Sequence, residues 1–203
     1  MKKFFLVIGI LFLAAFNAIA DEYTLFTGDA YRVNTATNYL DETQFRIKYD
    51  DSRNVYYLYT SNWMNKIWIY LSEDDLQTIR YAMRKYQDWV KIANEKQVEI
   101  DKEIPDSTIR TKVSWKSGVS WYRSSEFKLY FDVCTLKNTQ CHRFIISSNI
   151  VTASSNEFVD VKLDTLYFEE KEVADFLAGI SENNISAAKK EHNKKKEAQD
   201  LFN

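Results

Sequence analysis

Two segments of the chain carry apolar residues at the alternating three- and four-residue spacing of an amphipathic helix. The first begins after Ser72 and has its apolar stripe at Leu76, Ile79, Met83, Tyr86, Val90 and Ala93. Ser72 followed by Asp75 is typical of a helix N-terminus, where a serine cap and an acidic third residue are both favoured. The second segment has Val173, Phe176, Leu177 and Ile180 on one face and then continues as a charged, mostly polar tail. The spacing therefore predicts two long α-helices.

The other segments alternate with the period of two that is expected of β-strands. Residues 43–60 alternate on either side of a polar turn at residues 50–54, which predicts a hairpin, and residues 65–71 lead directly into the first helix. After Pro105 the same period recurs in residues 108–115, 119–124, 126–134, 141–151 and 158–168. The pattern predicts an α+β fold: an antiparallel β-sheet in two strand-rich halves, with the two long helices packed on it.

The chain divides into two halves of similar order, residues 21–104 and residues 105–203, each with strands followed by a helix. The second half ends in the charged helical tail. The strand-to-helix junctions at residues 69–79 and 167–177 both pass from apolar residues into an acidic first turn. A tandem duplication of a β-meander plus a helix would explain this likeness, but so would the general preference for acidic residues at helix starts. One compact domain and two pseudo-repeats both remain open.

Residues 1–20 have the pattern of a signal peptide, with Lys2 and Lys3, an apolar run over residues 4–16 and a small-residue cleavage motif ending at Ala20. A retained membrane anchor is the alternative, but the apolar run is shorter than the roughly 20 residues of a spanning helix. We expect an exported bacterial protein, periplasmic or extracellular, with no transmembrane segment in its mature chain.

Composition narrows the class of protein further. The 203 residues carry a net charge of −2, and loss of Lys2 and Lys3 with the leader would make the chain more acidic. A nucleic-acid-binding protein usually shows a basic excess, so no nucleic-acid partner is predicted. Aromatic residues make up 15% of the chain, with only four glycines and one proline, which indicates an ordered protein with a substantial core.

The chain has two cysteines, Cys134 and Cys141, at the ends of two predicted strands. Pairing them in a hairpin places Phe131 opposite Phe144, so that apolar residues meet on one face. Directly opposed strand residues lie within disulfide range. A zinc site lacks ligands because the chain has only two histidines, and the spacing is not that of a C-x-x-C redox motif. We predict a disulfide between Cys134 and Cys141.

Motifs of catalysis are missing from the sequence. It contains no P-loop, dinucleotide fingerprint or EF-hand pattern. His142 lies in a predicted strand and His192 in the charged tail, and neither is near a nucleophile motif. The acidic clusters fall in turns and at helix starts, where capping and solvation explain them. No cofactor, metal site or catalytic residue is predicted, and enzymatic activity is uncertain but not favoured.

The aromatic residues are the best candidates for a functional surface. Tyr56, Trp63, Trp68 and Tyr70 fall at positions that could face away from the core and form a binding platform. The alternative is that both faces of the sheet are covered. The sequence favours a non-enzymatic binding or interaction protein whose partner is a protein, a cell-envelope component or a small amphipathic ligand. A carrier with an apolar cavity and a hydrolase with dispersed carboxylates are the alternatives.

Overall fold

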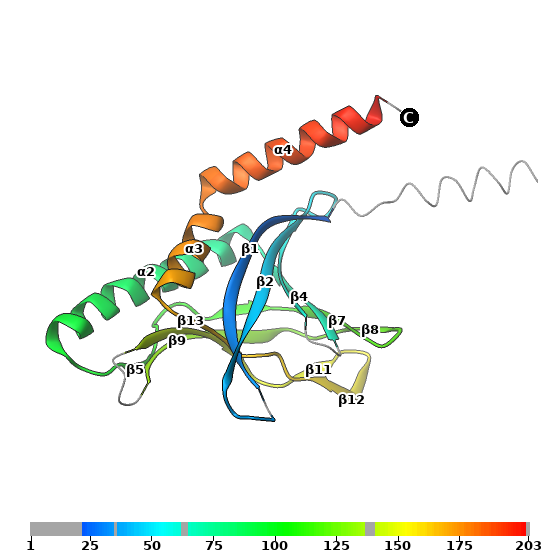
Figure 1. The fold of residues 1–203 in the computed structure, drawn as a ribbon. Helices are drawn as coiled ribbons and strands as arrows, with labels where there is room; N and C mark the ends of the chain where they lie inside the picture. The colour runs from blue at the N-terminus through cyan, green and yellow to red at the C-terminus, as the bar shows by residue number, and fades with distance from the viewer. Residues whose placement is uncertain (1–21, 35, 62–64, 137–140, 202–203) are drawn as a thin grey trace, which may run out of the picture.

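The computed structural model describes residues 22–34, 36–61, 65–136 and 141–201, so the predicted leader (residues 1–20) and Trp63 lie outside the described residues. In these ranges a curved antiparallel sheet packs against helices (Figure 1), which confirms the predicted α+β architecture. The strands are β1 (Glu22–Val33), β2 (Leu40–Asp50), β3 (Val55–Ser61), β4 (Asn65–Leu71), β5 (Asp101–Glu103), β6 (Ile109–Thr111), β7 (Val113–Ser117), β8 (Ser120–Arg123), β9 (Phe127–Thr135), β10 (His142–Ser148), β11 (Val151–Ala153), β12 (Asn156–Val161) and β13 (Leu166–Phe168). The helices are α2 (Glu73–Lys96), α3 (Glu170–Gly179) and α4 (Glu182–Asp200).

In the described part of the chain, eleven strands form one sheet, in the order β5-β9-β10-β13-β1-β2-β3-β4-β7-β8 with β6 beside β9, while β11 and β12 form a separate hairpin. Only Lys112 separates β6 from β7, yet β6 pairs with β9 and β7 pairs with β4. Where the chain passes between them, the hydroxyl of Thr111 donates to the carbonyl of Tyr70. These pairings close the sheet on itself, so it has an inner face that lines the core and an outer face that points away from it.

Strands from both predicted halves share this sheet. β13, from residues 105–203, pairs with β10 of the same half and with β1 of residues 21–104. This shared sheet does not show the tandem duplication that the similar strand-to-helix junctions at residues 69–79 and 167–177 allowed.

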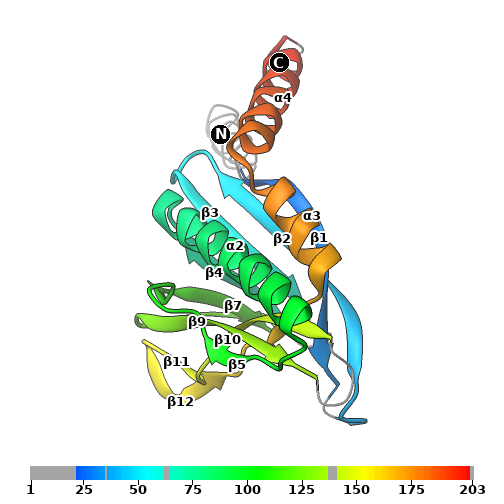
Figure 2. The same cartoon turned by 90° about the vertical axis from the view of Figure 1, so that its left-hand side faces the viewer.

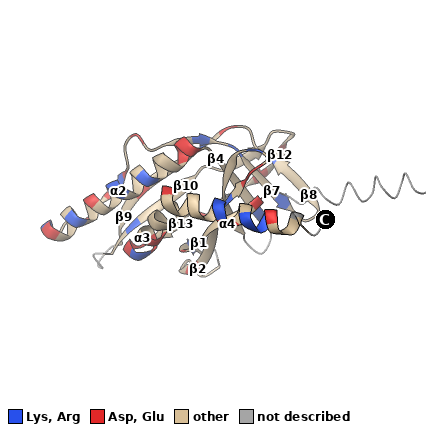
Figure 3. Ribbon diagram, turned by 90° about the horizontal axis from the view of Figure 1, so that it is seen from above, with Lys and Arg blue, Asp and Glu red and all other residues tan. Residues whose placement is uncertain are grey.

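Helix α2 forms where the sequence predicts it. Ser72 caps the helix: its Oγ accepts from the amide of Asp75 at 3.1 Å, and the Asp75 carboxylate accepts from the Ser72 amide at 2.7 Å. All six residues of the predicted stripe are buried. Figure 2 shows the helix lying obliquely across the sheet, and Figure 3 shows acidic and basic residues alternating along its exposed side. Among the described residues, no helix is long and apolar enough to cross a membrane.

The second predicted helix is two helices, which corrects the prediction of two long ones. Helix α3 ends at Gly179, and Ser181 begins α4 by accepting a hydrogen bond from the amide of Asn184 at 3.3 Å. A serine cap inside an otherwise helical pattern starts a new helix because its side chain replaces a backbone hydrogen-bond partner. Within α3, Val173 and Phe176 are buried as predicted.

Aromatic side chains dominate the contact between α3 and the sheet. The ring centre of Phe176 lies 4.5 Å from that of Phe45 on β2 and 5.8 Å from that of Phe168 on β13. Each such buried side chain contributes about 1.5–3 kcal/mol to folding. Phe26 of β1 packs closely on Gly179, which leaves no room for a larger residue there.

The hairpin of β9 and β10 pairs two residues away from the predicted register. Phe144 lies opposite Val133 rather than Phe131, and Arg143 lies opposite Cys134. A slip of two residues keeps every side chain on its predicted face, so alternation alone does not detect it. Cys141 is therefore diagonal to Cys134 rather than opposite it, and both residues carry thiols. The prediction of a disulfide between them is wrong.

Candidate functional site

The predicted aromatic residues do not all lie on one face of the sheet. Trp68 and Tyr70, two residues apart on β4, both point to the outer face and are partly exposed. Tyr56 is buried on the inner face, where its ring centre lies 4.7 Å from that of Tyr49. Its inclusion in the predicted surface is wrong because Tyr57, not Tyr56, pairs with Tyr70 across β3 and β4. Trp63 lies outside the described residues.

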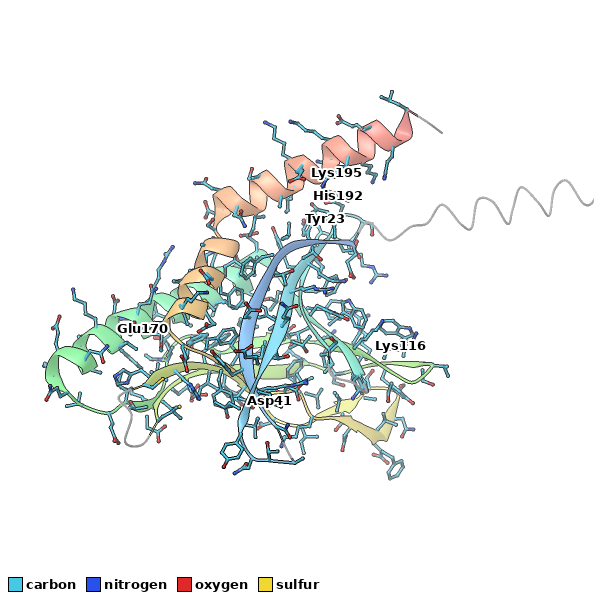
Figure 4. All side chains as sticks on the ribbon, in the orientation of Figure 1. Tyr23, Asp41, Lys116, Glu170, His192 and Lys195 are labelled. Atoms are coloured by element: carbon cyan, nitrogen blue, oxygen red, sulfur yellow. The ribbon has the colours of Figure 1, made fainter. Side chains whose placement is uncertain are left out.

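Three rows of directly paired residues cross the outer face. The first row is Arg46, Tyr59, Trp68, Ser114 and Arg123; the second is Lys48, Tyr57 and Tyr70; the third is Ser61, Lys66, Lys116 and Trp121. Each row combines aromatic and basic side chains. We call this surface the aromatic–basic face. It consists of the aromatic and basic residues of the three rows, together with Arg53 of the adjoining turn. Figure 4 shows Lys116 at the end of the molecule away from Glu170 of α3.

The rings on this face contact one another in a chain. Trp68 lies at the centre, with its ring centre 4.9 Å from those of both Tyr59 and Trp121. Tyr57 and Tyr70 form a second, edge-on pair at 5.0 Å. Trp121 is 57% exposed, whereas Tyr57 is buried beneath the others. The outer face therefore presents indole rings that fixed neighbours hold in place.

Basic side chains already cover some of the tyrosine rings. The Nζ of Lys48 lies 4.6 Å from the ring centre of Tyr59, and the guanidinium carbon of Arg123 lies 4.9 Å from that of Tyr70. These are cation–π distances. The contacts hold the positive charges beside the rings.

Polar groups complete the surroundings of Trp68. The carboxylate of Glu22 accepts from Lys48 Nζ at 2.6 Å and from the indole nitrogen of Trp68 at 3.5 Å. The hydroxyls of Tyr70 and Ser114 lie 2.9 Å apart in a hydrogen bond. Burial raises the pKa of Tyr57. Its neutral phenol is able both to donate and to accept hydrogen bonds.

These residues surround a cavity of about 500 Å³. Its aromatic walls come from Tyr57, Trp68, Tyr70 and Trp121. Its polar groups come from Glu22, Arg53 and Ser114. A largely aromatic cavity of this size with a few polar groups is typical of small-molecule and single-ring binding sites.

Two other surface cavities lie beside α3 and are less suited to a ring. One, of about 520 Å³, lies between α2 and α3, and its lining has no aromatic side chain. The other, of about 340 Å³, lies between β1 and α3, where Phe26 is its one aromatic residue and Asp29, Glu172 and Asp175 make it acidic. Neither combines several rings with basic groups.

The two histidines lie away from the aromatic–basic face. His142 is buried, and its ring nitrogens lie 2.8 Å from Thr135 Oγ1 and 3.1 Å from Asn94 Oδ1. His192 of α4 stacks on Tyr23 of β1 with ring centres 3.7 Å apart. Both residues are labelled in Figure 4. Within the described ranges, no group of three or more histidine, cysteine or acidic residues is placed to hold a metal ion.

The cysteine thiols also belong to another part of the molecule. They lie in the β9–β10 hairpin, where Cys134 lies opposite Asp101 of β5 and Cys141 Sγ lies 3.7 Å from a carboxylate oxygen of Glu169. Burial raises the pKa of both thiols, and the nearby Asp101 and Glu169 raise it further. A raised pKa lowers the thiolate fraction, so neither cysteine is suited to act as a nucleophile.

Comparisons of the chain with protein-family models, with curated proteins and with solved structures gave no match. The function of the chain is therefore inferred from the residues and geometry of the aromatic–basic face.

Proposed function

We propose that this chain is an exported, non-enzymatic binding protein whose ligand presents a flat ring to the aromatic–basic face. The observation that carries the proposal is the cavity of about 500 Å³ that Trp68 and Trp121 help to line, together with the polar groups of Glu22, Arg53 and Ser114. Rigid aromatic surfaces gain binding energy from ring burial, and polar groups at the rim orient the ligand. The leader pattern of residues 1–20 supports export.

Binding accounts for the site better than hydrolysis. A glycosidase-type hydrolase needs two carboxyl groups within roughly 5–10 Å of each other on either side of its substrate. Of the described residues that line the cavity, Glu22 alone carries a carboxylate, and it is paired with Lys48. A charged, paired carboxylate is suited to accept hydrogen bonds from a ligand rather than to donate a proton.

An enclosed apolar carrier site is also less well supported. Large fully buried side chains, among them Trp115, Phe131 and Phe144, occupy the core between the helices and the inner face of the sheet. The cavity on the aromatic–basic face is instead on the outer surface and has polar edges. Such a site suits an amphipathic ligand with hydroxyl or charged groups.

Binding assays with the full mature chain would test this proposal. Tryptophan fluorescence would be followed while neutral oligosaccharides, acidic oligosaccharides, nucleotides and detergent monomers are added in turn. We expect a ring-bearing ligand to shift the emission and Trp121→Ala to weaken its binding at least tenfold. The matched control is Phe158→Ala, which removes another highly exposed aromatic residue, on β12, and should leave binding unchanged. Equal weakening by both variants, or no response to any ring-bearing ligand, would refute the proposal.

A further inference from the structure

The aromatic–basic face carries a local charge opposite to that of the chain. Six basic side chains lie on it: Arg46, Lys48, Arg53, Lys66, Lys116 and Arg123. The acidic side chains among them are Glu22, which contacts Lys48, and Asp50, which contacts Arg53. The whole chain has a net charge of −2, so positive charge is concentrated on this surface. A surface of this kind attracts and orients anionic partners.

The positive charges extend well beyond the cavity. Arg46 on β2 and Arg123 on β8 are the two ends of one row that crosses five strands. At roughly 4.8 Å between neighbouring strands, this row spans about 19 Å. One sugar ring or one base does not reach across that width, so the charges fit a chain of linked anionic units better than a single small molecule.

Single-stranded nucleic acid is one polymer of this kind, but the rings are poorly arranged for it. Its binding sites stack successive bases on several open aromatic faces. Here Lys48 lies over Tyr59, Arg123 lies over Tyr70, and Tyr57 is buried. Trp68 and Trp121 are then the remaining rings of the face, and they contact each other at 4.9 Å. This arrangement offers one stacking position rather than a series.

An acidic polysaccharide fits these features better. One sugar ring would lie against Trp68 and Trp121, and its hydroxyls would donate to the carboxylate of Glu22 and exchange hydrogen bonds with Ser114. Carboxylates on the neighbouring sugars would pair with the basic residues on either side, which are held in fixed positions by the sheet.

We propose that the ligand of the aromatic–basic face is an acidic polysaccharide built from hexuronate units, bound across β2, β3, β4, β7 and β8 with one ring in the cavity. This inference rests on the proposed function and specifies its ligand class. Nothing in it requires a chemical step, since the polymer is held and not cleaved.

The test uses the mature chain and three fluorescently labelled probes, namely a hexuronate oligomer, its methyl ester and a single-stranded oligothymidylate. Binding is measured by anisotropy. We expect the hexuronate oligomer to bind at least tenfold more tightly than its neutral methyl ester and more tightly than the oligothymidylate. Raising the salt concentration should weaken the hexuronate complex, because salt screens exposed charge pairs.

Variants locate the effect on the sheet. The double variant Lys116→Gln/Arg123→Gln should weaken hexuronate binding at least tenfold, and Trp121→Ala should do the same. Lys195→Gln, which removes an exposed lysine of α4 away from the sheet, is the matched control and should have no effect (Figure 4).

Each remaining outcome separates the two proposals. Equal binding of the hexuronate oligomer and its methyl ester would overturn the acidic ligand and leave the ring-binding function standing. Tighter binding of the oligothymidylate than of the hexuronate oligomer would overturn the acidic-polysaccharide ligand in favour of nucleic acid. Loss of hexuronate binding in the charge variant but not in Trp121→Ala would show a non-specific cationic surface and would refute both proposals.

Discussion

Replacing Gly179 by alanine should destabilise the protein by about 1–3 kcal/mol, because the added methyl group has no room where α3 meets β1. A Cβ atom at this position would lie 2.3 Å from Cδ2 and 2.4 Å from Cγ of Phe26. Ordinary contacts between carbon atoms are roughly 3.5–4.0 Å. The Phe26 ring is itself stacked on Phe176, with ring centres 6.0 Å apart. Relief of the overlap therefore requires the Phe26 ring or α3 to shift.

Urea unfolding followed by tryptophan fluorescence would measure this cost. The variants are Gly179→Ala, Phe26→Ala and the two combined. Removal of the Phe26 ring opens the space that the new methyl group needs, so Gly179→Ala should cost at least about 1 kcal/mol less in that background. Gly118→Ala is the control: its φ of 60° makes an alanine strained by roughly 1–2 kcal/mol, but no atom lies within 4 Å of the added carbon. That cost should be the same with and without Phe26.

Two results would contradict the predicted overlap of Gly179→Ala with Phe26. If Gly179→Ala were as stable as the parent protein, Phe26 would not pack on Gly179. If its cost were unchanged by Phe26→Ala, the destabilisation would have another origin than the overlap of these two residues.

Three further predictions follow from other contacts. The buried Tyr86 hydroxyl donates to the carbonyl of His142 at 2.8 Å, so Tyr86→Phe should lose about 1–2 kcal/mol in urea unfolding at pH 7. Burial raises the pKa of Tyr86 above its ordinary value of 10.0, so the contribution of Tyr86 to folding stability is complete below that pH and is lost as the pH rises further. Tyr86→Phe should therefore lose less stability at alkaline pH than the parent protein. An equal loss would contradict this prediction. Because Cys134 and Cys141 are thiols, treatment with a reductant should leave the mass of the protein unchanged, and a mass gain would contradict the structure. Because the pKa values of both thiols are raised in the folded protein, a thiol reagent at pH 8 should react faster with the protein in urea than with the folded protein. His192→Ala should speed hydrogen exchange in α4 and not in α2, since the stack on Tyr23 holds α4 to the sheet, and unchanged exchange would show that the stack contributes nothing.

Helical periodicity predicts α2 almost completely, because one side of it packs on the sheet and the other faces water. Its apolar stripe and its Ser72 cap both follow from local rules. The break between α3 and α4 is a harder case, since Ser181 is also compatible with a continuous helix. The spacing of the buried residues widens between Ile180 and Ile185, which favours a break but does not by itself end a helix.

Alternation along a strand predicts which residues share a face but not which residues are opposite. The β9–β10 hairpin has its apolar residues on the predicted inner face, yet the pairing differs by two residues. Since the side-chain period is two, both registers bury the same residues. The disulfide prediction depended on the register itself and failed for that reason.

The aromatic surface was only partly predictable for a similar reason. Strand β3 has aromatic residues on both faces, so hydrophobicity does not indicate that Tyr57 and Tyr59 face outward while Tyr56 faces the core. Trp121 lies on the short strand β8, far along the chain from Trp68, and joins it only because β7 pairs with β4. The global charge also concealed the basic character of this face, because charge is segregated by the fold and not along the sequence.

Two-dimensional NMR of the tryptophan indole N–H groups, during titration with a hexuronate oligomer, would show whether the ligand binds in the cavity of the aromatic–basic face. Trp68 and Trp121 line the cavity, whereas Trp115 is buried in the core and Trp89 lies on α2. We predict that the indole signals of Trp68 and Trp121 shift in proportion to bound ligand, while those of Trp115 and Trp89 stay in place. Binding that shifts Trp89 and leaves Trp68 and Trp121 unchanged would contradict that prediction.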